Sequence, residues 1–429
     1  MTGVLPDPLG LRRIDATPAA LRVADEIRQR GPITFHRFME IALFDSDVGY
    51  YTRIGSGPGA EADYVTSPEI HGAFGALITT QLEQLWRFLG RPDPFWLVEG
   101  GPGTGRFAMD VLQVAEQAYP EFASALTLAL IERNPRLIAV QRERLAPWLP
   151  RVTWLDPDPT TWLCLGTGCV FANELLDAFP VHRLIGTATG IRERYVTAGG
   201  DPFVGAGQFV ETGQFVEAGQ LVETGQFAEI EGPLSSDRLT QPIAAGGGTL
   251  APGCLGEVSL EAPRWVSAAA RLLDRGYLLL VDYGEPADRL YGPDHPAGTL
   301  RAYRQHLRSD DLLALPGQQD LTADIDLTAA TSAAQSAGLT LVGSTRQSEF
   351  LDRLGLLDMV AGLVEHFPRR DVEYAHRKAL DTLWNQIDLG RLAVLLFGKA
   401  APTDLPRGFG GAGHWTFPDV PPAWRLGEQ

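Results

Sequence analysis

A glycine-rich turn follows a short apolar stretch near residue 100. Residues 98–110 read VEGGPGTGRFAMD, with Gly101, Gly103 and Gly105 at alternate positions. Glycine tolerates positive φ and lets a ligand approach the backbone closely. A helix that begins directly after such a turn presents free N–H groups to the ligand. The pattern therefore predicts a strand, a ligand-binding turn made by these three glycines, and a helix.

The spacing of the glycines distinguishes two kinds of ligand. Dinucleotide-binding turns follow the pattern G-x-G-x-x-G, whereas this turn reads G-x-G-x-G and has Arg106 where the third glycine would fall. Glu99 ends the preceding strand, and its charge would repel a pyrophosphate but attract the ammonium group of a methionine moiety. We therefore favour S-adenosylmethionine as the ligand. The structural alternative is a turn that only shapes the strand-to-helix corner.

Acidic residues also end the next two apolar stretches. Residues 126–132 end at Glu132, which could accept hydrogen bonds from both hydroxyls of a ribose. Residues 151–155 are followed by Asp156, a candidate partner for an adenine amino group. An aspartate before a proline is also typical of turns, which is the alternative for Asp156.

A third group of polar residues lies in FANELLDAFP at 171–180. Asn173, Glu174 and Asp177 follow a strand, at the carboxyl end where open α/β sheets bind ligands. Helix capping is the structural alternative for Asp177. For Asn173 and Glu174 a functional role is favoured, because polar groups beside a cofactor are costly to bury without a partner.

Short apolar stretches that alternate with helical patterns must position these residues. Such alternation predicts an α/β fold with a mostly parallel sheet. The expected strands are 95–99, 126–132, 151–155, 168–174, 277–284, 339–345 and 391–400, and the expected core helices are 106–118 and 135–145.

Helical patterns also precede the glycine turn. The first begins at Thr17, with Pro18 at its first position, and Pro32 ends it. A second helix follows through Phe35 and Leu43, and residues 70–89 predict a third, amphipathic helix. We divide the chain into a helical N-terminal region (1–90) that contributes to the site, a core (91–400) with insertions at about 185–265 and 285–330, and a C-terminal tail (401–429).

A six-residue repeat occupies residues 207–230, which read GQFVETGQFVEAGQLVETGQFAEI. Near-identical copies indicate a recent expansion within a surface hairpin that tolerates changes in length. A small β-solenoid arm is the alternative. Neither interpretation assigns chemistry to this segment.

Charge and composition narrow the classes of partner. The chain has 429 residues and a formal net charge of -17, which disfavours binding to nucleic acid or to anionic lipid. Its three cysteines form no CxxC pair, so we expect no metal site. Residues 1–18 contain no apolar h-region and no apolar run of about 18 residues occurs, so we expect neither a signal peptide nor a membrane span. Lysine occurs only at Lys378 and Lys399, which indicates a GC-rich bacterial genome, and we expect a cytoplasmic location.

Eight stretches of the chain together resemble one family. They are GPITFHRFMEIALFDSDVGYY (31–51), DYVTSPEIHGAFG (63–75), VEGGPGTGR (98–106), NELLDAFPVHR (173–183), LLLVDYGEP (278–286), GTLRAYRQH (298–306), DLTADIDL (320–327) and SEFLDRLG (348–355). In number and order they resemble the MidA-like family of S-adenosylmethionine-dependent methyltransferases, whose mitochondrial members methylate protein arginine and assist assembly of respiratory complex I.

The resemblance implies a class I methyltransferase fold with a Rossmann-like core. It implies that the glycine turn and Glu132 bind the cofactor. The segment TSPE would line the active site near the cofactor, and the family's NE-xx-DA-x-P segment would belong to the same site. The matching residues here are Thr66, Ser67, Pro68 and Glu69, and Asn173, Glu174, Asp177 and Pro180. Two positions depart from the family: Ala62-Asp63-Tyr64 replaces GDF, and Asp324 replaces a histidine.

The implied acceptor is an arginine on the surface of a protein, such as a complex I subunit or its bacterial equivalent. A guanidinium group stays charged at physiological pH, so the site should hold it with carboxylates and aim one nitrogen at the methyl group. Glu174 and Glu69 are the candidates for this clamp, followed by Asp177. Tyr50 and Tyr51 could close the pocket, with core packing expected for at least one of them. A non-catalytic assembly protein and a small-molecule methyltransferase are the alternatives.

Overall fold

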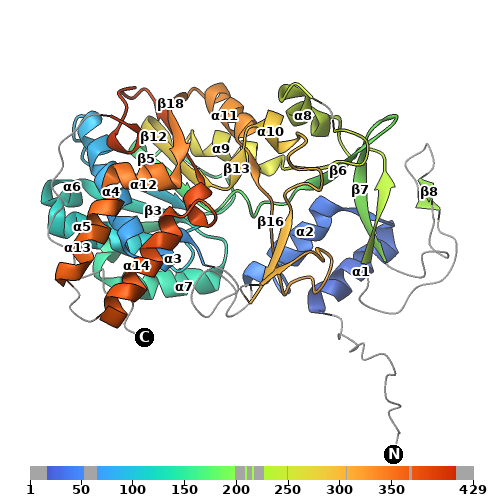
Figure 1. Cartoon of the computed structure of the whole chain (residues 1–429), viewed down its shortest axis with the longest axis horizontal. Helices are drawn as coiled ribbons and strands as arrows, with labels where there is room; N and C mark the ends of the chain where they lie inside the picture. Colours follow the sequence, from blue (N-terminus) through green and yellow to red (C-terminus); the bar gives the residue numbers. More distant parts are fainter. Residues whose placement is uncertain are drawn as a thin grey trace, which may run out of the picture.

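The computed structural model describes residues 17–52, 65–198, 208–209, 215–216, 227–248, 250–305, 307–366 and 370–411. These residues form a large α/β lobe and a smaller lobe built on an antiparallel sheet. The α/β lobe lies on the left of Figure 1, and the smaller lobe with α1 and α2 lies on the right.

The large lobe is built on a seven-stranded sheet in the order β18-β19-β12-β5-β2-β3-β4. Its strands are β2 (Phe95–Gly100), β3 (Leu126–Ile131), β4 (Val152–Leu155), β5 (Gly166–Asn173), β12 (Leu273–Asp282), β18 (Thr340–Arg346) and β19 (Ala393–Lys399). The strands from β12 to β4 pair in parallel, while β19 runs antiparallel to both of its neighbours. The mostly parallel α/β core predicted from the sequence is confirmed.

The order of the strands reverses beside β2. The chain passes from β2 to β3 and β4 on one side and then returns to β5 on the other side of β2. In open α/β sheets, ligands bind in the crevice outside the carboxyl ends of the strands at such a switch point. Here the glycine turn leaves β2 and Asn173 ends β5, so both lie at this crevice.

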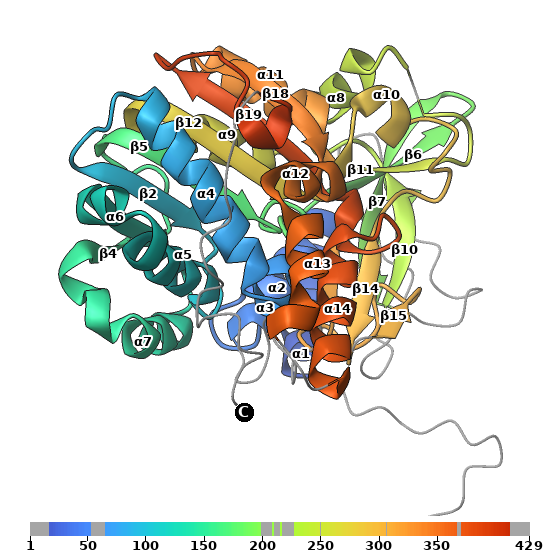
Figure 2. The same ribbon diagram turned by 60° about the vertical axis from the view of Figure 1, so that its left-hand side comes forward.

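Helices cover both faces of the sheet, because alternate strand residues point to opposite sides. Leu97 and Phe171 lie in the core cluster on one face, and Val98 and Val170 lie in the cluster on the other. The first face is covered by α4 (Ala73–Phe88), α5 (Arg106–Ala118), α6 (Pro120–Ala125), α12 (Gln347–Leu354), α13 (Leu356–His366) and α14 (Arg370–Trp384). The second face is covered by α9 (Glu261–Ala269) and α11 (Leu327–Ser336). Figure 2 shows α4 and α5 lying across the first face.

The single helix expected at 70–89 is confirmed as α4, which begins three residues later than expected, at Ala73. A short helix, α3 (Ser67–Ile70), precedes α4, and the break falls at His71–Gly72. The amphipathic pattern is wrong for the first half of α4, where residues 73–82 are all buried. The reason is that α5 and α12 both pack against α4 and leave it no solvent face there.

The N-terminal helices begin and end where the sequence predicts. Thr17 caps α1 (Pro18–Arg30) by accepting a 3.0 Å hydrogen bond from the N–H of Ala20, and α1 ends at Gly31 with φ of 78°. After β1 (Ile33–Thr34) come α2 (Phe35–Phe44) and the short turn η1 (Tyr50–Thr52). No helix among the described residues is both long and apolar enough to cross a membrane.

The smaller lobe carries a sheet in which β7 pairs with β1, β6 and β10, and β6 also pairs with β11. Its strands are β6 (His182–Thr187), β7 (Gly190–Ala198), β10 (Phe227–Gly232) and β11 (Leu255–Val258). α7 (Pro135–Arg144) belongs to the large lobe, where Gln141 contacts the glycine turn. Further short elements are α8 (Gln241–Ala245), α10 (Ala287–Leu290), β13 (Gly284–Glu285), β14 (Arg301–Arg304), β15 (Leu307–Ser309), β16 (Asp320–Thr322) and β17 (Ile325–Asp326). Phe38 of α2, Val196 of β7 and Leu321 of β16 share one core cluster, which joins α2 to this lobe.

The structure describes part of the hexapeptide repeat. Its strands β8 (Gln208–Phe209) and β9 (Phe215–Val216) pair with each other as a separate antiparallel sheet, and its last copy enters β10. The other residues of 207–230 lie outside the described part of the chain, as do Ala62–Tyr64 and residues 412–429.

Removing two copies of the repeat should leave the protein intact. We expect deletion of residues 213–224 to change the melting temperature and the cofactor affinity little, because shortening a surface connection costs little loop entropy. Thermal unfolding and calorimetric titration with S-adenosylhomocysteine measure both quantities. A loss of several degrees or a marked drop in affinity would mean that the repeat packs on the core or shapes the site.

Candidate active site

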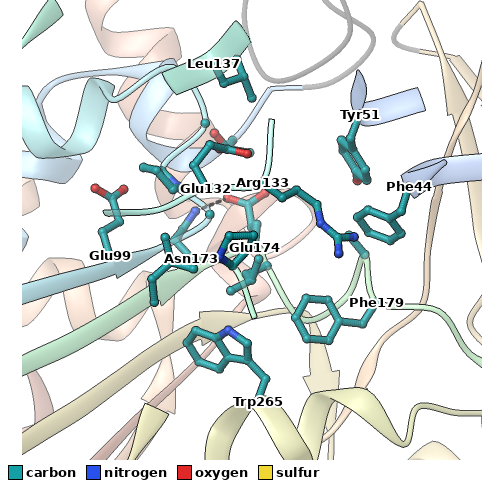
Figure 3. Close-up of a pocket in the computed structure, with 18 of the residues that line it drawn as sticks. Phe44, Tyr51, Glu99, Glu132, Arg133, Leu137, Asn173, Glu174, Phe179 and Trp265 are labelled. Atoms are coloured by element: carbon teal, nitrogen blue, oxygen red, sulfur yellow. Dashed lines mark hydrogen bonds between the residues drawn. The ribbon is translucent and has the colours of Figure 1, made fainter. Parts of the chain in front are cut away.

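A cavity of about 520 Å³ lies at the carboxyl ends of β2, β3 and β5. Both lobes line it, and Figure 3 shows its side chains converging from both. The lining includes His36, Glu40, Phe44, Tyr51, Thr66, Pro68, Glu69, Glu99, Gly101, Gly103, Glu132, Arg133, Asn173, Glu174, Phe179, Pro180, Glu261 and Trp265. Most of the residues singled out in the sequence therefore meet in one place.

The glycine turn adopts a backbone that only glycine accepts without strain. Gly101, Gly103 and Gly105 have φ values of 66°, 52° and 78°. A Cβ added to Gly101 would come within 2.8 Å of Leu175 Cδ1. Gly105 is the residue before α5, and Gly101 and Gly103 line the cavity. The turn thus presents its backbone to the cavity.

Gln141 of α7 fixes the turn from behind and was not identified from the sequence. Its fully buried side chain donates a 2.7 Å hydrogen bond to the carbonyl of Gly103 and a 3.4 Å one to Glu132 Oε2. Its own oxygen accepts a 2.8 Å hydrogen bond from Trp154 Nε1. A glutamine in the middle of a polar helix gives no sequence signal, because its burial arises only when α7 packs under the turn.

Glu99 is buried at the end of β2, and its Oε2 has no hydrogen-bond partner among the described residues. Burial and the nearby charge of Glu132 raise the pKa of Glu99 to about 8. Asn173 Oδ1 is also buried without a described partner. Buried acceptors without partners are costly, so this end of the cavity fits a cationic ligand with several N–H donors, such as the ammonium group of S-adenosylmethionine.

Glu132 lies at the end of β3, where a ribose-binding acid was expected. Its Oε1 accepts a 2.8 Å hydrogen bond from the N–H of Asn134. Burial raises the pKa of Glu132, against the effect of that hydrogen bond. The carboxyl group faces the cavity with its orientation fixed by Asn134 and Gln141.

Glu174 follows β5 in a left-handed backbone conformation, with φ of 47°. Its Oε1 accepts hydrogen bonds from the N–H of Ser67 (2.9 Å) and from Asn173 Nδ2 (2.8 Å). Burial raises the pKa of Glu174 to about 7, although these hydrogen bonds oppose the rise. A non-glycine residue with positive φ is uncommon. The backbone conformation and the two hydrogen bonds therefore fix the direction of the Glu174 carboxyl group. The two family segments meet through these contacts.

The other residues of the TSPE segment divide between two roles. Thr66, Pro68 and Glu69 line the cavity. Ser67 is buried behind them, where its hydroxyl donates to Gln347 Oε1 at 3.2 Å. The Thr104 hydroxyl donates a short hydrogen bond to Glu69, which ties that carboxylate to the glycine turn.

Asp177 occupies a different place from the one expected. The helix that it would cap does not exist, because the chain turns at residues 177–179 and enters β6. Asp177 is buried and does not line the cavity. Burial, followed by the charges of Asp282 and Glu174, raises its pKa well above the usual value. A direct contact with an acceptor is therefore not available to Asp177 in this arrangement.

Asp282 at the end of β12 shapes the loop that carries Glu174. Its Oδ2 accepts hydrogen bonds from the N–H groups of Leu175 (3.2 Å) and Leu176 (2.8 Å). Asp282 was not predicted from the sequence, although it is an acid at a strand end, as are Glu99 and Glu132.

Three further expectations concern the edge of the cavity. The Asp156 side chain is exposed and accepts a 2.8 Å hydrogen bond from the N–H of Asp158, so it forms a turn and does not line the cavity. Tyr50 is buried in the core, whereas Tyr51 lines the cavity and donates to Asp320 Oδ1 at 2.7 Å. Asp324 pairs with Arg301 at 2.7 Å.

The sheet order, the glycine turn and the acids at the strand ends define a Rossmann-like methyltransferase. Residues 77–345 match a family model described as that of an S-adenosyl-L-methionine-dependent methyltransferase. The chain belongs to the MidA-like family of these enzymes, and its cofactor is S-adenosylmethionine.

Relatives and solved structures cover most of the chain. A mitochondrial protein arginine methyltransferase NDUFAF7 homologue of Drosophila melanogaster is 30% identical over 78% of this chain and 74% of its own length. Human mitochondrial protein arginine methyltransferase NDUFAF7 is 26% identical over 87% of this chain and 81% of its own. A crystal structure of a likely methyl transferase from Burkholderia thailandensis, bound to S-adenosyl-homocysteine, superposes with a TM-score of 0.73 at 26% identity, covering 91% of this chain and 94% of that one.

Replacing Gly103 with Val should abolish cofactor binding while the fold largely survives. A β-branched side chain at φ of 52° strains the turn and enters the ligand space. Calorimetric titration with S-adenosylhomocysteine measures the loss. Gly90→Val is the matched control, because Gly90 also has positive φ (81°) but has open space around it and does not line the cavity. Unchanged affinity in Gly103→Val would place the cofactor elsewhere.

Cofactor affinity should rise with pH between about 6 and 7.5. The pKa of Glu99 is about 8 in the free protein, so an ammonium group that needs the ionised carboxylate must expel a proton below that pH. Titrations with S-adenosylhomocysteine in two buffers of different ionisation enthalpy measure both the affinity and the proton release. In Glu99→Gln we expect weaker binding with less dependence on pH. Wild-type binding without proton release would contradict the assignment of Glu99.

Proposed function

We propose that the protein transfers a methyl group from S-adenosylmethionine to an arginine side chain of another protein, in the bacterial cytoplasm. The observation that carries this proposal is Glu174, a cavity-lining carboxyl group held in a left-handed backbone by Ser67 and Asn173. The mitochondrial relatives named as protein arginine methyltransferases support the choice of acceptor.

The cofactor would be held by residues at the ends of β2 and β3. Gly101 and Gly103 offer their backbone, Glu99 takes the ammonium group and Glu132 takes the ribose hydroxyls. When bound, the cofactor supplies an electrophilic methyl group. Thr66, Pro68 and Asn173 line the same cavity and complete the cofactor's surroundings.

The acceptor would be held by carboxylates. A guanidinium group is charged at pH 7 and forms strong, directional hydrogen bonds with carboxylates. Glu174 orients the acceptor nitrogen, and Glu69 on the opposite segment offers a second carboxylate. Burial raises the pKa of Glu174 to about 7, so its ionised form can also accept the proton that the guanidinium nitrogen loses when it is methylated.

Replacing Glu174 with Gln should separate cofactor binding from methyl transfer. The amide keeps the shape of the side chain but removes its charge, and truncating one partner of a buried charge pair typically costs on the order of 2–5 kcal/mol. We expect methyl transfer to an arginine-containing peptide to fall by a factor of about 30 or more, while the affinity for S-adenosylhomocysteine changes little. Turnover and calorimetric titration measure the two quantities.

Glu143→Gln is the control, because this substitution removes the same charge at an exposed position of α7. Full turnover in Glu174→Gln would remove Glu174 from the acceptor clamp. Loss of cofactor binding in that variant would instead assign Glu174 to the cofactor.

The acceptor itself can be found by mass spectrometry of cells with and without the gene. Subunits of bacterial respiratory complex I are the first proteins to inspect, given the family resemblance. Methylated arginines that disappear with the gene support the proposal. Cofactor binding with no lost protein methylation would favour a small-molecule acceptor, and absence of cofactor binding would favour an assembly role without catalysis.

A further inference from the structure

Arg133 follows Glu132 directly and extends into the cavity from the end of β3. Its guanidinium carbon lies 4.9 Å from the centre of the Phe44 ring, and the Tyr51 ring lies 5.2 Å from that of Phe44. Figure 3 shows the guanidinium end pointing toward Phe44 and away from Glu99, with the Phe179 ring turned toward the same end of the cavity. An arginine of the protein itself therefore rests on the aromatic wall of the site.

Few interactions fix the guanidinium group of Arg133. Among the described residues, no carboxylate lies within ion-pair distance of Arg133, and its side chain makes no hydrogen bond. The residue as a whole is exposed at the mouth of the cavity. The cation–π contact with Phe44 contributes little at an exposed site, and the charge of Glu132 attracts the guanidinium group only from beyond ion-pair distance. Other arginines nearby are anchored differently, since Arg106 pairs with buried Asp110 at 3.0 Å.

The surroundings would suit another cation equally well. Within the described residues, the lining includes six glutamates and three arginines. A cation bound beside Glu99 or Glu174 stabilises the ionised carboxylate, which burial otherwise disfavours. The faces of Phe44 and Tyr51 add the quadrupole that binds a guanidinium group or a quaternary ammonium. A cation that also reached Glu174 would gain the charge-assisted hydrogen bonds that Arg133 lacks.

We propose that the Phe44–Tyr51 ring pair is the subsite that receives the cationic side chain of the acceptor, and that Arg133 occupies this subsite until the acceptor displaces it. The inference rests on the proposed function for the identity of the acceptor. Arg133 is then a specificity-determining residue: it lowers the apparent affinity for every acceptor by the fraction of time that it is seated. An acceptor cation displaces Arg133 effectively only if it forms hydrogen bonds with carboxylates in addition to contact with the rings.

The first test measures binding without catalysis. The probe is N-ethylguanidinium, titrated by ligand-observed NMR into protein saturated with S-adenosylhomocysteine, with the neutral N-ethylurea as the comparison ligand. We expect Arg133→Met to bind the guanidinium probe roughly threefold to tenfold more tightly than wild type, with no gain for the urea. Equal or weaker binding of the guanidinium probe by Arg133→Met would overturn the proposal.

Arg142→Met is the matched control. Arg142 lies on the exposed part of α7, rests on the Trp154 ring at 4.2 Å and does not line the cavity. Its replacement removes the same charge and the same kind of ring contact, and we expect the wild-type affinity for the probe. A gain as large as that of Arg133→Met would show an effect of net charge and would contradict displacement.

Phe44→Leu in the Arg133→Met background tests the ring itself. We expect it to reverse most of the gain in probe affinity and to leave the affinity for S-adenosylhomocysteine unchanged. Unchanged probe affinity would overturn the assignment of the subsite. Weaker binding of S-adenosylhomocysteine by Arg133→Met would instead assign Arg133 to the cofactor and would also overturn it.

Kinetics separate this inference from the proposed function. With an arginine peptide, Arg133→Met should lower KM by roughly threefold to tenfold and leave kcat unchanged. If no arginine peptide is methylated but the probe results hold, the subsite stands and the acceptor is another cation. If peptides are methylated and KM rises in Arg133→Met, the proposed function stands and the displacement is wrong.

Discussion

Parallel pairing of β2 with β3 on one side and with β5 on the other is the constraint on which the rest of the site depends. Strands that pair in parallel all end at the same edge of the sheet, and the reversal of strand order beside β2 opens a crevice there. Glu99, Glu132 and Asn173 are far apart in the chain, but each lies at the end of one of these three strands. The crevice therefore collects polar side chains from the last residues of these strands and from the residue directly after β3.

Collecting carboxyl groups in a buried space has a cost in folding free energy. The pKa of Glu99 is about 8 and that of Glu174 is about 7, above the 4.5 of an ordinary glutamate. A carboxyl group whose pKa rises on folding destabilises the folded protein progressively as the pH increases from the unfolded to the folded value. A cationic ligand offsets that loss by binding the ionised form. The residues whose burial costs folding free energy are therefore those that a positively charged cofactor can stabilise.

The smaller lobe and the N-terminal helices complete the cavity. His36 of α2 contacts Glu261 of α9 at 3.0 Å, and Tyr51 contacts Asp320 of β16 at 2.7 Å. These contacts join α2 and η1 to elements that follow much later in the chain, and they place Phe44 and Tyr51 opposite the ends of the core strands. The aromatic wall that Arg133 touches is consequently a product of contact between the lobes.

The sequence by itself determined the α/β core, the glycine turn and the acids at the strand ends. These features depend on local patterns: apolar runs of strand length, glycines at positions of positive φ, and polar residues directly after a strand. Tertiary structure alone decided which side of a segment faces the ligand. Gln141 lies buried under the turn, and Asp156 faces solvent. No helix follows Asp177, and the N–H of Ser67 donates to Glu174. Such outcomes depend on contacts between segments distant in sequence, and no local pattern of residues encodes them.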